Sequence, residues 1–152
     1  MPKIDISKLQ PQTATAYPDA FKHVVEGREK LRLGDAVGLT QFGVNLTRLK
    51  PGAGSALRHW HEHEDEFVYI LEGEVVLIEN EGETILKRGD CAAFKANVAN
   101  GHCLINRTQK DALMLEVGTR GSRERAHYPD VDLVYEVDGT TRRILRKDGT
   151  PY

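Results

Sequence analysis

Residues 58–66 read RHWHEHEDE and place three histidines, His59, His61 and His63, within five positions. In an extended chain alternate side chains share one face, so all three imidazoles would lie on the same side of a strand. Two imidazoles spaced in this way can converge on one metal ion. The run EFVYIL that follows is typical of a β-strand. This stretch therefore predicts a metal site built on a sheet.

Further ligands would come from other strands. Glu66 begins the apolar run and can supply a carboxylate, while His102 begins a second β-like run, HCLIN, and can supply a third imidazole. A set of three imidazoles and one carboxylate suits Mn, Fe, Ni, Co or Zn and does not select among them. We expect one divalent transition metal ion, of unspecified identity, as the cofactor.

The spacing resembles the first motif of the cupin superfamily, G-x5-H-x-H-x3,4-E-x6-G. Four residues match it from its first histidine to its last glycine: His59, His61, Glu66 and Gly73. The leading glycine would fall at Ala53. The resemblance also decides the register, because pairing His61 with His63 would require a glutamate at position 67 or 68, where Phe and Val stand. It implies that His59 and His61 are the paired ligands.

The second cupin motif, G-x5-P-x-G-x2-H-x3-N, is recognisable but altered. Gly89 begins it, and His102 with Asn106 matches H-x3-N. Lys95 and Asn97 replace its proline and second glycine, and two extra residues precede His102. The resemblance therefore implies His59, His61, Glu66 and His102 as the metal ligands. Because the second motif is altered, a cupin barrel that no longer binds metal is the alternative.

The remaining polar residues of the histidine-rich stretch are expected to lie in a turn. His63 is interpreted as solvent-exposed, with a substrate contact as the alternative. Glu62, Glu64 and Asp65 are expected to keep the turn hydrated, and one of them could serve as an acid or base at the mouth of the site. Candidates for binding an anionic ligand are Arg48, Lys95 and Arg107, and Arg58 is a further candidate. Each could instead be an exposed charge at the rim of the barrel.

Glycine is frequent, and the segments between glycines are short runs rich in β-branched and aromatic residues. Such runs at intervals of about 8 to 12 residues predict an all-β protein. The runs are FGVNLTRL, EFVYIL, EVVLIEN, ETILKR, CAAFKA, HCLINR and ALMLEV. The segment EGEVVLIENEGETILKRGD is expected to form a hairpin. The KRGD turn that follows it is expected to close a further strand pair. A helical turn is expected around PDAFKHVVEG and an added hairpin in DLVYEV-DG-TTRRIL.

The resemblance implies one cupin-type jelly-roll β-barrel spanning 1–152, with the core barrel at about 40–120. Residues 1–39 would form an N-terminal arm, and residues 121–152 would add edge strands. Within the barrel, Trp60, Phe67 and Tyr69 are expected to pack between sheets. Val68 and Ile70, which share the parity of Glu66, are expected to line the cavity.

The bulk properties exclude several classes of protein. A net charge of −2 gives no electrostatic reason to bind nucleic acid. No apolar run approaches the roughly 20 residues that span a bilayer, and the start MPKIDISKLQPQ has no apolar core of a secretory signal. Two cysteines, Cys91 and Cys103, make no disulfide framework. We expect a cytoplasmic protein that binds neither nucleic acid nor membrane.

Cupins include dioxygenases, isomerases, decarboxylases and ligand-binding modules, so the fold does not select the reaction. The chain is similar to small bacterial cupins described as sugar-phosphate-isomerase-like. We expect a metal-dependent enzyme, isomerase-like or dioxygenase-like, acting on a small organic acid or a sugar-derived metabolite. The alternatives are a non-catalytic metabolite-binding cupin and a metal-free barrel acting as a dimer. A homodimer is expected in which N-terminal strands join the partner's sheet.

Overall fold

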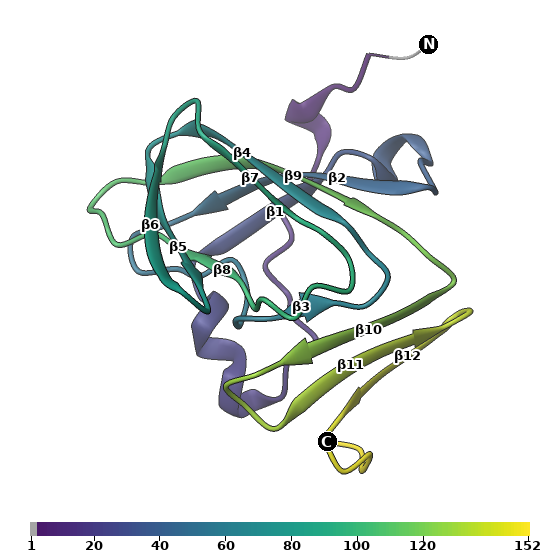
Figure 1. The fold of residues 1–152 in the computed structure, drawn as a ribbon. Coiled ribbons are helices and arrows are strands. Elements are labelled where there is room, and N and C mark those ends of the chain that lie inside the picture. The colour runs from purple at the N-terminus through teal and green to yellow at the C-terminus, as the bar shows by residue number, and fades with distance from the viewer. Residues whose placement is uncertain (1–2) are drawn as a thin grey trace.

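The structure, a computed structural model, describes residues 3–152. Within those residues the chain forms three short 3-10 helices and twelve strands (Figure 1). The helices are η1 (Ile6–Lys8), η2 (Asp19–Val25) and η3 (Asp35–Val37). The strands are β1 (Arg28–Arg32), β2 (Phe42–Leu49), β3 (Trp60–His61), β4 (Glu66–Glu72), β5 (Glu74–Glu79), β6 (Gly82–Lys87), β7 (Cys91–Phe94), β8 (Cys103–Ile105), β9 (Ala112–Thr119), β10 (Arg123–Tyr128), β11 (Leu133–Asp138) and β12 (Thr141–Leu145).

The strands form three antiparallel sheets. Their orders are β1-β2-β9-β4-β7, β6-β5-β8 and β12-β11-β10-β3. Figure 1 shows the five-stranded and three-stranded sheets facing each other, with the four-stranded sheet below them. The expected all-β jelly roll is confirmed. The C-terminal strands do more than extend an edge, because β10 pairs with β3, the short strand that carries His61.

The core lies between the five-stranded and three-stranded sheets. Val68 and Ile70 of β4 are buried in it, as their shared parity with Glu66 predicted. The prediction for Phe67 and Tyr69 was wrong: they lie on the opposite face of β4 and are 38% and 39% exposed. No sheet within residues 3–152 covers that face. Trp60 is half-buried and stacks on the ring of His127, with 4.2 Å between centroids.

Consecutive strands do not always pair. The hairpin expected in residues 74–87 is confirmed, with Glu79 opposite Gly82 in the β5–β6 pair. The KRGD turn, however, does not close a pair. It carries the chain to the other sheet, where β7 pairs with β4. A turn motif indicates that the chain changes direction, but it does not identify the strand with which the next segment pairs.

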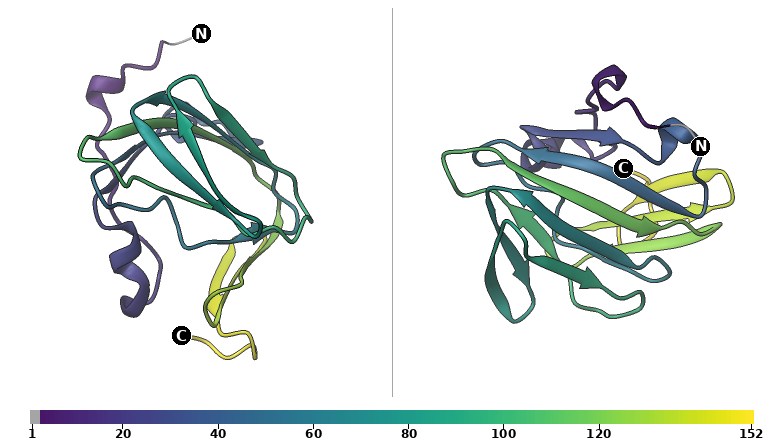
Figure 2. Two further views of the ribbon diagram at one scale, coloured as in Figure 1. Left: turned by 60° about the vertical axis from the view of Figure 1, so that its left-hand side comes forward. Right: turned by 90° about the horizontal axis from the view of Figure 1, so that it is seen from above.

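Helix η2 and the C-terminal hairpin lie at the same end of the molecule (Figure 1). The helical turn expected near PDAFKHVVEG is present as η2, and the expected C-terminal hairpin is β11–β12. Figure 2 shows this hairpin, in yellow, extending beyond the barrel. Tyr17 and Phe21 pack against a cluster formed by Ala126, Tyr128 and Leu133. The N-terminal segment is thereby fixed to the four-stranded sheet.

Cys91 is exposed and Cys103 is buried, and both are free thiols. Burial raises the pKa of the Cys103 thiol to about 11, which fits a core residue. No helix in the part of the chain that the structure describes is long and apolar enough to cross a membrane.

Candidate metal centre

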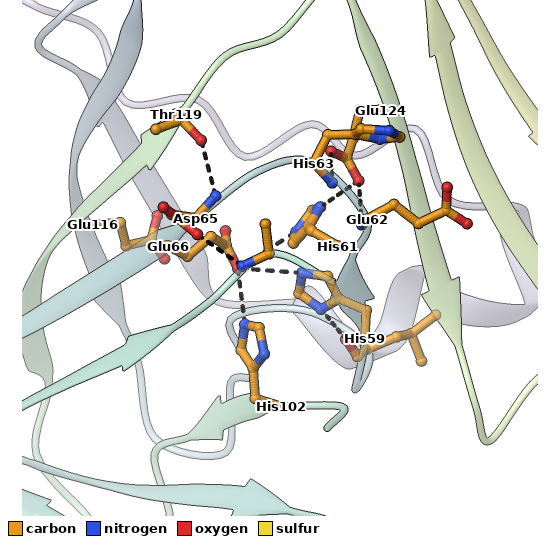
Figure 3. Close-up of polar contacts among 12 residues, drawn as sticks. His59, His61, Glu62, His63, Asp65, Glu66, His102, Glu116, Thr119 and Glu124 are labelled. Carbon is orange, nitrogen blue, oxygen red and sulfur yellow. Dashed lines mark hydrogen bonds and ion pairs between the residues drawn. The ribbon is translucent and has the colours of Figure 1, made fainter. Parts of the chain in front are cut away.

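Three imidazoles converge on one carboxylate oxygen. The Nε2 atoms of His102, His61 and His59 lie 2.8, 3.4 and 3.8 Å from Oε2 of Glu66. Figure 3 shows the three rings approaching the Glu66 carboxylate from different directions. His59, His61 and Glu66 offer ligand atoms close enough together to hold a metal ion. The sequence-predicted set of four residues is therefore gathered at one place.

Backbone pairing brings these residues together across the chain. His59 and His102 form an isolated antiparallel bridge, with N–H to O distances of 3.1 and 2.8 Å. His61 lies opposite Ala126 of β10. Glu66 is the first residue of β4 and shares the inward face with Val68 and Ile70. Each predicted ligand is thus fixed by a strand or a bridge, which makes the arrangement rigid.

Two of the histidines have their Nδ1 atoms held by an acceptor. His59 Nδ1 donates to the carbonyl oxygen of Leu57 at 2.8 Å, and His61 Nδ1 lies 3.3 Å from Oε1 of Glu124. An imidazole that donates from Nδ1 leaves Nε2 as the atom that can bind a metal. Nε2 of His61 is buried and has no hydrogen-bond partner among the described residues. The donor set fits a divalent ion, and so does His61 Nε2, which forms no hydrogen bond and lies 3.4 Å from the Glu66 carboxylate.

Burial and charge pairing set the protonation of the group. Burial lowers the pKa of His59 to about 4, so this imidazole is neutral. Burial also opposes a charge on His61, but the carboxylates of Glu124 and Glu66 outweigh it and raise its pKa to about 10. For Glu66 burial is likewise outweighed, because contacts with His102 and His61 hold its pKa well below the usual range. The centre thus contains a carboxylate, a neutral imidazole and an imidazolium.

Glu124 is a functional candidate that the sequence did not reveal. Its side chain is on β10 and is 3% exposed. Besides His61, its carboxylate accepts hydrogen bonds from the backbone N–H groups of Glu62 and His63 at 3.1 and 3.0 Å. It fixes both the ring of His61 and the turn that follows. Its run, RERAHY, carries no motif, so only the β3–β10 pairing could have identified it.

The turn residues separate in space. His63 is exposed, as predicted. Glu62 contacts Nε2 of His127 at 2.6 Å, and Asp65 accepts a hydrogen bond from the backbone of Ala96. Glu64 is different because its side chain lines the cavity beside the histidines. It is therefore the acid of this turn that is placed to meet a ligand.

The histidines open onto a cavity of about 310 Å³ inside the barrel. His59, Glu66 and His102 line it, together with Phe94, whose ring lies parallel to that of His102 with centroids 3.5 Å apart. Two cations on β1, Arg28 and Lys30, also line it. Neither was singled out from the sequence, because both precede the motif region and reach the cavity only through the β1–β2 pairing.

The cations that the sequence did suggest lie elsewhere. Arg48 pairs with Asp111 at 3.2 Å, and Arg107 pairs with Glu83 at 2.6 Å, each as an exposed ion pair. Lys95 is exposed and lines two neighbouring pockets, but it does not line the cavity of the histidines. The structure therefore does not bring these three residues to the predicted metal ligands.

Comparison with solved structures places the chain in a family. A protein from Silicibacter pomeroyi, described as a sugar phosphate isomerase from a cupin superfamily, is 47% identical, with a TM-score of 0.95 over 99% of this chain and 96% of that one. The chain belongs to the cupin superfamily. The model of the cupin domain matches residues 45–118 of this cupin, which include every predicted ligand.

Two further structures are similar to this cupin. A protein from Acidithiobacillus ferrooxidans, proposed to be a sugar phosphate isomerase, is 26% identical, with a TM-score of 0.75 over 82% of this chain and 80% of that one. The polyketide cyclase RemF from Streptomyces resistomycificus is 15% identical, with a TM-score of 0.65 over 78% and 79% of the two chains, and it shares the fold alone. No protein with a curated description matches the sequence.

Proposed function

We propose that this cupin is a metal-dependent enzyme that acts on a small organic acid or a sugar-derived metabolite. The observation that carries the proposal is the convergence of three Nε2 atoms on Oε2 of Glu66. His59, His61, Glu66 and His102 would hold one divalent transition metal ion. Such an ion supplies a Lewis acid that stabilises negative charge developing on a substrate oxygen.

The chain's own residues would position the substrate and move its proton. Glu64 lines the cavity from the turn between β3 and β4, so its carboxyl can exchange a proton with a bound molecule. Part of the cavity wall is apolar and limits the access of bulk water; it is formed by Phe94, Val68 and Leu104. A proton carrier inside a partly apolar cavity suits proton transfer next to a carbonyl or hydroxyl group, as an isomerisation requires.

Isomerisation of a sugar phosphate is the reaction to test first, because the 47% identical protein is described as a sugar phosphate isomerase. Purified protein would be stripped with a chelator, reloaded separately with Mn, Fe, Ni, Co or Zn, and mixed with a panel of sugar phosphates. Conversion followed by NMR is expected only in metal-loaded samples. Oxygen consumption with small organic acids would indicate a dioxygenase instead, and no turnover with any loaded metal would contradict the enzyme proposal.

Glu64→Gln provides a matched test of the proton carrier. Because the amide cannot move a proton, the variant is expected to lose about 100-fold or more in kcat while keeping its metal content. Glu62→Gln is the control, since Glu62 contacts His127 and does not line the cavity. Equal activity of the two variants would remove Glu64 from the proposal.

We also propose that the protein is a homodimer formed through the outer face of the five-stranded sheet. Antiparallel sheets that face water usually carry polar residues outward. Here Phe42, Phe67 and Tyr69 are 40%, 38% and 39% exposed on that face, beside Leu115 and Val117. Apolar side chains grouped on an exposed sheet face are typical of an interface. The free edge at β1 is partly taken by Gln12 of the same chain, so we favour the face over exchanged strands.

A further inference from the structure

The cavity contains a buried cation that forms no ion pair within residues 3–152. Arg28 begins β1, and its residue is 9% exposed. It lines the same cavity as His59, Glu66 and His102. The inward face of β1 also carries Lys30, two positions further along, as the alternation of a strand requires. The N-terminal strand thus brings positive charge to the wall of the predicted metal centre.

The guanidinium of Arg28 is only partly satisfied. Its Nη1 donates to the carbonyl oxygen of Ser55 at 2.6 Å. Its Nε is buried and has no hydrogen-bond partner among residues 3–152, and no carboxylate of those residues forms an ion pair with this side chain. Placing a charged group inside a protein without a counter-charge costs free energy. An anion bound beside the guanidinium would offset that cost.

The other cations that line the cavity differ from Arg28 in this respect. Nζ of Lys30 lies 2.8 Å from Oε2 of Glu116, the same oxygen that accepts a hydrogen bond from Thr47. Nη2 of Arg120 lies 2.6 Å from Asp35. Of the cations along this wall in the described part of the chain, Arg28 is therefore the one whose charge is left for a ligand.

We propose that Arg28 binds an oxyanion group of the ligand, a carboxylate or a phosphate, inside the barrel. The inference rests on the proposed function, because a ligand in this cavity would meet Arg28 on one side and the predicted metal ligands on another. A guanidinium suits such groups, since its planar fork can donate two parallel hydrogen bonds. A cavity of about 310 Å³ is at the small end for ligand sites, which favours a small metabolite.

A purely structural role for Arg28 makes a different prediction. If its task were only to hold the carbonyl of Ser55, its replacement would lower stability and leave the affinity for anions unchanged. Calorimetric titration distinguishes the two roles. The probes are acetate, inorganic phosphate and acetamide, which has the shape of acetate without its charge. Each is titrated into metal-loaded and metal-stripped protein, and the metal content of every sample is measured.

Wild-type protein is expected to bind acetate or phosphate and to show no binding of acetamide; the tighter of the two anions identifies the chemistry of the ligand. Arg28→Gln is expected to weaken that binding at least about tenfold. Arg48→Gln is the matched control, because Arg48 lies on the neighbouring strand β2 in an exposed ion pair, and it should bind as the wild type does. Unchanged affinity in Arg28→Gln, or no anion binding by the wild type, overturns the proposal.

Arg28→Lys covers the case in which Arg28→Gln does not fold. It keeps the charge but loses the planar fork, so a several-fold loss of anion affinity with unchanged metal content supports the proposal, and full affinity overturns it. The metal measurement keeps the two proposals apart. Anion binding that depends on Arg28 in a protein that takes up no metal would refute the metal-dependent function alone. Full metal content with anion affinity independent of Arg28 would refute the oxyanion site alone.

Discussion

At the scale of single residues, the histidines of this cupin differ in what orients them. His59 is fixed by a backbone carbonyl and His61 by the carboxylate of Glu124. A carboxylate behind a metal-binding histidine fixes the ring and makes its Nε2 a better donor. Glu124 should therefore affect the metal without touching it.

Replacing Glu124 by Gln is expected to weaken metal affinity by about 10- to 100-fold after correction for the proton that leaves His61, because the amide no longer supplies a full negative charge to the ring. Competition with a chelating dye measures the affinity. Glu83→Gln is the control, since Glu83 forms an exposed ion pair with Arg107 and does not line the cavity. The same affinity in both variants would show that Glu124 does not support the centre.

Metal uptake by this cupin should depend on pH through His61. Its pKa is raised from 6.5 to about 10, so the metal-free protein holds a proton on this ring at neutral pH. A metal bound at Nε2 must displace that proton, and its apparent affinity should rise by up to about tenfold per pH unit between about pH 7 and about pH 8.5. Titrations in buffers of different ionisation enthalpy would detect the released proton. A flat profile would contradict a charged His61.

Whether a residue of the centre could be predicted depends on its distance along the chain from the histidines. His59, His61 and Glu66 could be predicted because they are close in sequence and their spacing is meaningful on a strand. Arg28 and Glu124 could not, because long-range pairing places them: β1 with β2 for Arg28 and β10 with β3 for Glu124. No local pattern distinguishes these two from surface charges.

At the scale of elements, Gly73 explains why the first cupin motif ends in glycine. The chain leaves β4 in one sheet and enters β5 in another at this residue, with φ at +76°. A Cβ here would lie 2.7 Å from the carbonyl oxygen of Asp111 and 3.0 Å from Cα of Ala112. Both neighbours are backbone atoms of the segment that leads into β9, so they cannot move aside cheaply.

Gly73→Ala is therefore expected to lower the free energy of unfolding by about 3 kcal/mol, combining the strained φ with the clash. Gly52→Ala is a matched control: its φ is +83°, but nothing lies within 4 Å of a Cβ there. It should cost about 1 kcal/mol. Urea denaturation measures both. Equal losses would mean that the close approach of Gly73 to Asp111 has no energetic weight.

Strands were easier to predict than their partners. The runs of β-branched and aromatic residues coincide closely with β2 and β4 through β9, because local composition determines which segments are extended. Pairing depends on distant segments. Local sequence therefore does not show that the KRGD turn leads to a pairing with β4, or that the outward face of β4 is exposed.

At the scale of the whole molecule, the outer face of the five-stranded sheet tests the proposed dimer. Tyr69→Lys places a charge on that face, where Tyr69 is opposite Leu115 and Cys91. Light scattering is expected to give the mass of a dimer for the wild type and of a monomer for the variant. Arg107→Glu should leave the mass unchanged, because Arg107 is exposed and pairs with Glu83 on β6 of the three-stranded sheet. A monomeric wild type at micromolar concentration would refute the dimer.

We propose that one metal ion is held by His59, His61, Glu66 and His102. Elemental analysis of protein purified after metal-supplemented expression measures this most directly. About one transition metal ion per chain is expected in the wild type, and almost none in a His59→Ala, His61→Ala double variant that keeps its β-sheet circular dichroism. A wild type without metal, or a double variant that retains it, would contradict this ligand set.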